Sequence, residues 1–89
     1  MKTKIEMWAA LYVQTNETSD GKPKILKVCS TKEEAENEVY MDMVQWERDF
    51  GEDYRMNYDN KSAEKSDDPT STCEWSVGRF EIEVSVNPA

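Results

Sequence analysis

Helical periodicity is confined to one stretch of this chain, residues 31–50. At about 100° per residue, five apolar side chains of this stretch form a stripe about 80° wide: Ala35, Val39, Met43, Trp46 and Phe50. Ser30 and Glu33 have the spacing of a capping box, and Gly51 follows the last apolar residue as a C′ residue. The pattern predicts a single helix of roughly five turns, so strands and turns have to build the rest of the fold.

The first candidate strand runs from Lys4 to Gln14 and alternates with period two. Its odd positions show the pattern of a half-buried strand, because all of them are apolar: Ile5, Met7, Ala9, Leu11 and Val13. The even positions are mixed, because they include Trp8, Ala10 and Tyr12. We therefore expect the middle of this strand to be covered on its second side as well, by another element or by a partner.

Turn-forming residues fill positions 16–23, and Asp20-Gly21 is the favoured reversal point. Residues 24–29 are partly β-branched and begin directly after Pro23, which an edge strand allows. These features predict a hairpin in which the first strand pairs with residues 24–29.

Residues 51–86 carry two strand patterns separated by a polar stretch. Alternation over 54–58 predicts either a short strand or an ordered segment that bears aromatic residues. Residues 59–71 are polar and acidic, and we expect a mobile, solvated loop there. From Cys73 to Val86 the alternation changes parity at Gly78, which indicates a bulge or a tight turn. This last segment is therefore either one long bulged strand or a hairpin.

The predicted order of elements is β-β-α-β, with one further strand if residues 73–86 form a hairpin. An 89-residue chain builds one domain with a small core, so we assign residues 1–89 to a single α+β domain. Its small antiparallel sheet would have three or four strands, with the long amphipathic helix packed on one face. The other face then has to be covered by the acidic loop, by self-association or by a partner.

Several classes of chemistry lack their residues in this chain. It has no histidine and only three glycines, which removes imidazole catalysis and leaves no phosphate-binding loop. Cys29 and Cys73 lack the spacing of a metal site, and the acidic residues match no EF-hand loop. We therefore predict a protein without enzymatic activity that has no catalytic residues, no metal and no cofactor.

The N-terminal sequence does not have the pattern of a secretion signal, because Glu6 interrupts the apolar stretch that starts at Ile5. No run of residues is long and apolar enough to cross a membrane, and anionic lipid headgroups repel an acidic surface. We expect a cytoplasmic protein that binds no membrane, located in the host cell if a phage encodes it.

The net charge of −8 is unevenly distributed along the chain. Residues 1–30 hold five bases and three acids, whereas residues 31–89 hold six bases and sixteen acids. A concentrated negative field attracts basic surfaces, of which nucleic-acid-binding clefts are the commonest, and it disfavours direct binding to nucleic acid. We predict a basic, nucleic-acid-binding protein partner, contacted by Glu34, Glu38, Asp42, Asp49, Glu52, Asp53, Asp67 and Asp68. The alternative is that the acidity only keeps the protein soluble.

Tyr40, Met41 and Val44 lie on a helix flank outside the core stripe. They are either the margin of the core or an apolar contact with a partner or a second copy. The same holds for Trp8 and Tyr12 if the sheet face that bears them is open. A homodimer, as part of a homo-oligomeric accessory or structural protein, is therefore the alternative function.

The run from Val28 to Ala35, VCSTKEEA, follows the predicted hairpin and is followed by a long acidic helix and a strand that bears Trp75. This arrangement resembles small proteins of phages and other mobile elements. In size, acidity and lack of catalytic residues the chain is also similar to phage-encoded inhibitors of host defence, including anti-CRISPR proteins. The resemblance implies an inhibitor that binds a nucleic-acid-handling host protein as a nucleic-acid mimic.

Overall fold

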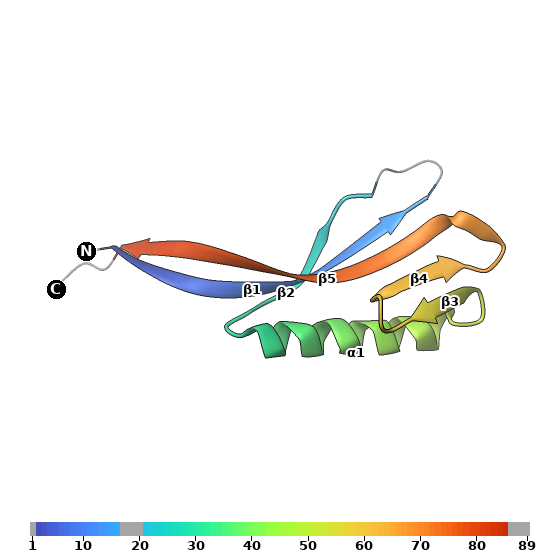
Figure 1. Ribbon diagram of the computed structural model, residues 1–89, viewed down its shortest axis with the longest axis horizontal. Coiled ribbons are helices and arrows are strands. Elements are labelled where there is room, and N and C mark those ends of the chain that lie inside the picture. Colours follow the sequence, from blue (N-terminus) through green and yellow to red (C-terminus); the bar gives the residue numbers. More distant parts are fainter. Residues whose placement is uncertain (1, 17–20, 86–89) are drawn as a thin grey trace.

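The computed structural model describes residues 2–16 and 21–85, in which it has one helix and five strands (Figure 1). The elements are β1 (Lys2–Thr15), β2 (Lys24–Cys29), α1 (Lys32–Phe50), β3 (Tyr54–Asn57), β4 (Ser62–Lys65) and β5 (Asp68–Ser85). The strands form one antiparallel sheet in the order β2-β1-β5-β4-β3. The predicted α+β class is confirmed, whereas the predicted number of strands and their order are wrong.

α1 begins one residue later than the expected capping box implied. Its N-cap is Thr31, whose Oγ1 accepts a hydrogen bond of 3.2 Å from the backbone N–H of Glu34. The helix ends at Phe50, and the N–H of Gly51 donates to the carbonyl of Glu47 while Gly51 keeps a right-handed conformation. Among the described residues, no helix combines the length and the apolar character needed to span a bilayer.

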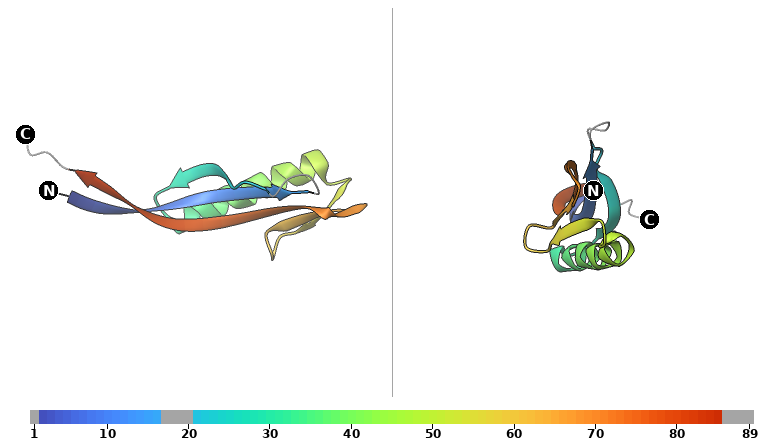
Figure 2. Two further views of the ribbon diagram at one scale, coloured as in Figure 1. Left: turned by 90° about the horizontal axis from the view of Figure 1, so that it is seen from above. Right: turned by 90° about the vertical axis from the view of Figure 1, so that its right-hand side faces the viewer.

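The core lies between α1 and one face of the sheet (Figures 1 and 2). α1 connects the two edge strands, β2 and β3, and contacts both of them as well as β1 and β5. Of the predicted helix stripe, Ala35, Val39 and Met43 are buried, Trp46 is partly buried and Phe50 is half exposed. The buried cluster consists of Ala10, Val39, Met43, Ala63, Cys73 and Trp75.

β1 packs against α1 through its even positions. Ala10 is fully buried in the core, and Tyr12 pairs with Trp75, their ring centroids lying 5.2 Å apart. Because side chains alternate along a strand, the apolar odd positions from Ile5 to Val13 lie on the opposite face. We call the sheet face turned away from α1 the outer face.

β5 is one continuous strand that pairs with β1 in regular register from Thr72 to Ser85. Trp75 faces α1, whereas Phe80 lies on the outer face. The expected bulge or turn at Gly78 is therefore wrong. The parity changes there because α1 no longer covers the strand beyond this point, so the apolar side chains change face while the backbone stays regular.

The acidic stretch 59–71, expected to be a loop, contains β4 and the first residues of β5. Ala63 of β4 is buried and pairs with Met56 of β3 on one side and Cys73 of β5 on the other. β3 confirms the short strand expected within 54–58.

The expected hairpin of the first two strands is confirmed by the pairing of β1 with β2. Asp20, half of the expected reversal point, lies outside the described residues. Gly21 has a φ of +73°, in the left-handed region that glycine adopts at low cost.

The molecule is elongated. Its dimensions are 60 × 26 × 19 Å and its radius of gyration is 16.4 Å, against about 12 Å for a compact chain of this length. β1 and β5 continue past the other elements as a two-stranded projection, which Figure 1 shows on the left. We call it the ribbon, formed by residues 2–7 of β1 and 80–85 of β5.

Candidate interaction surfaces

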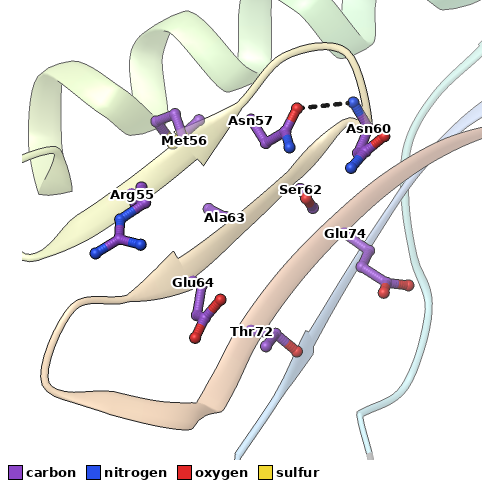
Figure 3. Close-up of a pocket in the computed structure, with 9 residues that line it drawn as sticks. All are labelled: Arg55, Met56, Asn57, Asn60, Ser62, Ala63, Glu64, Thr72 and Glu74. Atoms are coloured by element: carbon purple, nitrogen blue, oxygen red, sulfur yellow. Dashed lines mark hydrogen bonds between the residues drawn. The ribbon is translucent and has the colours of Figure 1, made fainter.

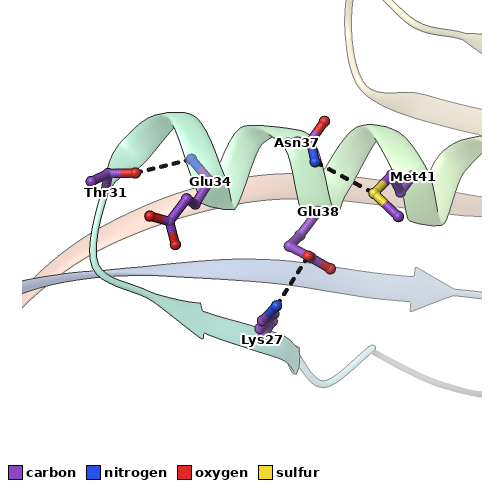
Figure 4. A network of polar contacts seen from close by, with 6 residues as sticks. All are labelled: Lys27, Thr31, Glu34, Asn37, Glu38 and Met41. Atoms are coloured by element: carbon purple, nitrogen blue, oxygen red, sulfur yellow. Dashed lines mark hydrogen bonds and ion pairs between the residues drawn. The ribbon is translucent and has the colours of Figure 1, made fainter.

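Four of the predicted partner-binding acids follow one another along a single flank of α1, where the helical repeat places them side by side. Together with Gln45 they form what we call the acidic flank: Glu34, Glu38, Asp42, Gln45 and Asp49. The flank is next to β2, because Glu38 accepts a hydrogen bond of 3.2 Å from Nζ of Lys27 (Figure 4). This bond raises the pKa of the Lys27 ammonium.

Asp42 also contacts the sheet. Its carboxylate accepts a hydrogen bond of 2.8 Å from the indole Nε1–H of the buried Trp75. Further along α1, the side-chain amide of Gln45 donates to both carboxylate oxygens of Asp49, at 3.1 and 3.2 Å. The side chain of Glu34 is exposed near the start of the helix (Figure 4). The acidic flank is therefore held in place by contacts with two strands.

A shallow groove of about 330 Å³ lies between α1 and β2, and three residues of the acidic flank line it. The lining residues are Leu26, Glu38, Met41, Asp42 and Gln45. Leu26 and Met41 make part of the wall apolar, and Glu38 and Asp42 add two carboxylates. A lysine or arginine side chain fits this chemistry, since its methylenes pack on apolar groups while its charged end binds carboxylates.

The other four predicted acids lie beyond the C-terminal end of α1, three of them in two adjacent turns and Asp68 at the start of β5. Glu52 and Asp53 follow the helix, and the N–H of Ser66 donates to the carbonyl of Asp53 at 2.8 Å. This bond brings the turn with Asp67 next to the turn with Asp53. The structure thus divides the eight predicted acids into two groups of four.

Asp68 differs from the other acids, because its carboxylate has several partners within the chain. It accepts hydrogen bonds from the backbone N–H and the hydroxyl of Thr70, at 3.1 and 2.6 Å, and from the hydroxyl of Ser71 at 3.0 Å. These bonds lower the pKa of Asp68. Asp68 therefore organises the start of β5.

The apolar residues of α1 that were predicted as a possible contact with a partner are accessible to solvent to different degrees. Tyr40 and Met41 are 58 % and 56 % exposed, and Val44 is half-buried. Tyr40 packs against Tyr58 with ring centroids 5.8 Å apart, whereas Met41 lines the groove between α1 and β2.

Trp8 and Tyr12 lie on the α1 side of the sheet rather than on its open face. Nζ of Lys32 is 5.9 Å from the ring centroid of Trp8, a cation–π distance. The hydroxyl of Tyr12 donates to Sγ of Cys73 at 3.4 Å, and burial raises the pKa of this hydroxyl. Both residues thus belong to the margin of the core.

A second concave site of about 340 Å³ lies where β3, β4 and β5 form the outer face (Figure 3). It is lined by Arg55, Met56, Asn57, Asn60, Ser62, Ala63, Glu64, Thr72 and Glu74. Arg55 and Glu64 occupy paired positions of β3 and β4, and Oδ1 of Asn57 accepts from the N–H of Asn60 at 3.0 Å. The lining mixes both signs of charge with small polar groups and indicates no particular ligand class.

An uncovered sheet face was expected, but with Trp8 and Tyr12 on it, whereas the structure forms the outer face from other residues. Nine large apolar side chains are exposed in the described part of the chain, and six of them lie on this face: Ile5, Ile25, Val28, Phe80, Ile82 and Val84. The signal for it was the parity change at Gly78. If the strand is continuous, this parity change places the apolar residues after Gly78 on the sheet face opposite Trp75.

Cys29 and Cys73 are buried free thiols, and burial raises the pKa of Cys73. Across residues 2–16 and 21–85, no three or more Asp, Glu, Cys or His side chains are grouped so that they could hold a metal ion.

No protein-family model matches the chain, and no curated protein or solved structure is significantly similar to it. What the protein binds has to be inferred from its own surfaces.

Proposed function

We propose that this protein is a small acidic interaction protein without enzymatic activity, which binds a basic, nucleic-acid-handling protein of its host. By occupying the basic surface it would exclude nucleic acid, as an inhibitor of the anti-defence type carried by phages does. The acidic flank and the groove beside it would make the central contact. The acids in the turns after α1 would extend the contact.

The groove between α1 and β2 is the observation that carries this proposal. It places the carboxylates of Glu38 and Asp42 beside the apolar side chains of Leu26 and Met41. Trp75 donates one hydrogen bond to Asp42, and a carboxylate has room for more than one donor. A partner's lysine or arginine would therefore find an apolar wall for its stem and two acceptors for its charged end.

The charge distribution supports a basic partner over a neutral one. Residues 31–50 contain seven acids and two bases, so the helix produces a locally concentrated negative potential. Such a potential accelerates association with a basic protein at low salt and is screened at high salt. Binding by this surface should therefore weaken steeply as ionic strength rises.

The test is affinity capture from a nuclease-treated lysate of the natural host, with the immobilised full-length protein. The groove variant Glu38→Gln/Asp42→Asn keeps the side-chain shapes and removes two charges. The matched control Glu81→Gln/Glu83→Gln removes the same two charges from the ribbon. Mass spectrometry identifies the captured proteins at low and at high salt, and a DNA- or RNA-binding assay of the captured protein measures inhibition.

We expect the wild type and the control to capture the same nucleic-acid-binding protein at low salt and to inhibit it. The groove variant should lose both capture and inhibition. Equal capture by the groove variant and the control would overturn the assignment of the groove. Capture without any effect on nucleic-acid binding would overturn the inhibitory function.

A further inference from the structure

The outer face carries exposed apolar side chains both in the ribbon and in the body of the sheet. In the ribbon, Ile5 pairs with Ile82 and Met7 pairs with Phe80, so each pair lies side by side on this face. In the body the face also carries Leu11 and two residues of β2, Ile25 and Val28. The six large exposed side chains of this face are 37–62 % accessible.

The ribbon lacks the support that a strand pair needs in water. A two-stranded ribbon alone is marginally stable, and a third strand or a packed element on its apolar face is required. Within the described residues, β2 pairs with residues 8–12 of β1, and β4 pairs with residues 68–74 of β5. The ribbon is therefore outside the reach of both neighbours, and its apolar face is open.

The molecule exposes more surface area than a compact monomer of its size. The chain exposes 6651 Å², whereas a compact monomer of its size exposes roughly 5,400 Å². A stable dimer removes about 800 Å² from each partner. The surplus area thus exceeds what one standard interface needs.

The distribution of charge on the ribbon favours a second copy of this chain as the partner that covers the outer face. The ribbon's outer face is made of Thr3, Ile5, Met7, Phe80, Ile82 and Val84, all uncharged, and its charged residues lie on the opposite face. There Arg79 pairs with Glu6 and Glu81, at 2.8 and 3.3 Å. A two-fold interface places one patch against itself, so a patch without charge avoids the repulsion that a protein of net charge −8 otherwise meets.

We propose that a second copy of this chain covers the outer face, so that the two sheets pack face to face in a symmetric dimer. The ribbon of each copy would lie against the apolar outer face of the other. α1 is on the opposite side of each sheet, so both acidic flanks remain exposed in the dimer. This inference does not depend on the proposed function, and either can fail without the other.

The test is sedimentation equilibrium of the full chain over a range of concentrations. The variant Phe80→Thr/Ile82→Thr removes two apolar side chains of the ribbon's outer face and keeps good strand formers. The control Glu81→Thr/Glu83→Thr introduces two threonines on the opposite face of the same strand and leaves the apolar side chains of the outer face in place. Near-ultraviolet circular dichroism of the tryptophans reports whether each variant keeps its core.

We expect the wild type and the control to sediment with twice the chain mass at micromolar concentration. The outer-face variant should be monomeric there, with its dissociation constant raised about 100-fold or more, because four apolar side chains are lost across the interface. A monomeric wild type would overturn the proposal. So would a dimer that the outer-face variant forms as well as the control does, since association would then use another surface.

Discussion

The carboxylate of Asp42 accepts a hydrogen bond of 2.8 Å from the indole Nε1–H of Trp75, and this bond joins α1 to β5. Trp75 is buried and its ring lies 5.8 Å from that of Trp46. Asp42, which helical spacing places on the acidic flank, therefore also stabilises the core. Asp42 serves the fold directly, whereas Glu34, on the same flank, has an exposed side chain.

Replacing Asp42 by Ala should destabilise the protein. The change leaves the indole N–H of Trp75 without its acceptor, which costs about 1–3 kcal/mol in the free energy of unfolding. Asp42→Asn should cost less, because its amide oxygen still accepts the bond. Urea unfolding followed by tryptophan fluorescence measures both, with Glu34→Ala as the control that should change stability by no more than about 0.5 kcal/mol. An equal loss in the control would contradict the assigned role of the hydrogen bond.

Replacing Lys27 by Met should strengthen binding to the basic partner. Lys27 occupies one side of Glu38 through its ion pair of 3.2 Å, so removing its ammonium frees a carboxylate at the groove. The captured protein should then elute from the immobilised variant at a higher salt concentration than from the wild type. Lys24→Met changes the net charge equally and has no such contact with Glu38 in the described residues. If both variants shift elution equally, the groove is not the site of contact.

The stability contributed by Asp68 should disappear in acid. Hydrogen bonds from Thr70 and Ser71 lower its pKa below the ordinary value of 3.8. A lowered pKa means that the folded state favours the ionised form, so the contribution is fully present above pH 3.8 and is lost as the pH falls through the lowered pKa. Urea midpoints of the wild type and Asp68→Asn should differ at neutral pH and converge in acid. A difference that stays constant with pH would contradict this, and Asp67→Asn is the control.

Gly78 in the central strand β5 and Gly21 before β2 should respond oppositely to alanine. Gly78 lies in a regular ladder, and an added Cβ would meet Cδ1 of Leu11 at 3.4 Å, an ordinary contact. Gly78→Ala should therefore stabilise the protein by up to about 1 kcal/mol, because alanine loses less backbone entropy on folding. Gly21 has a φ of +73°, and Gly21→Ala should cost about 1–2 kcal/mol. Urea unfolding measures both, and destabilisation by Gly78→Ala would indicate a bulge there.

The helix and four of the five strands could be predicted because their signals are local. The stripe from Ala35 to Phe50 has helical periodicity and a nearby N-cap, and the structure has the helix at Lys32–Phe50. β4 had no such signal, because Ser-Ala-Glu-Lys has low strand propensity. It is a strand because Ala63 packs in the core and both of its edges are paired.

The faces of β1 could not be assigned from its alternation. A strand with apolar residues on both sides leaves open which side the helix covers. The bulky residues Trp8 and Tyr12 lie toward α1, whereas the regular apolar series from Ile5 lies on the outer face. The acidic flank was placed correctly on one side of α1, because helical spacing determines it. Its bonds to Lys27 and Trp75 depend on tertiary packing, which spacing does not reveal.

The position of β5 determines when this chain can fold during its synthesis. β5 lies between β1 and β4, so it is the neighbour that joins the β1–β2 hairpin to the β3–β4 hairpin. It pairs with β1 over a sequence separation that extends from Lys2 to Ser85, and such distant contacts form slowly. Until the ribosome has released β5, the nascent chain lacks Cys73 and Trp75 and cannot close its core. The core therefore closes only after β5 has been translated, and the apolar stripe of α1 stays uncovered until then.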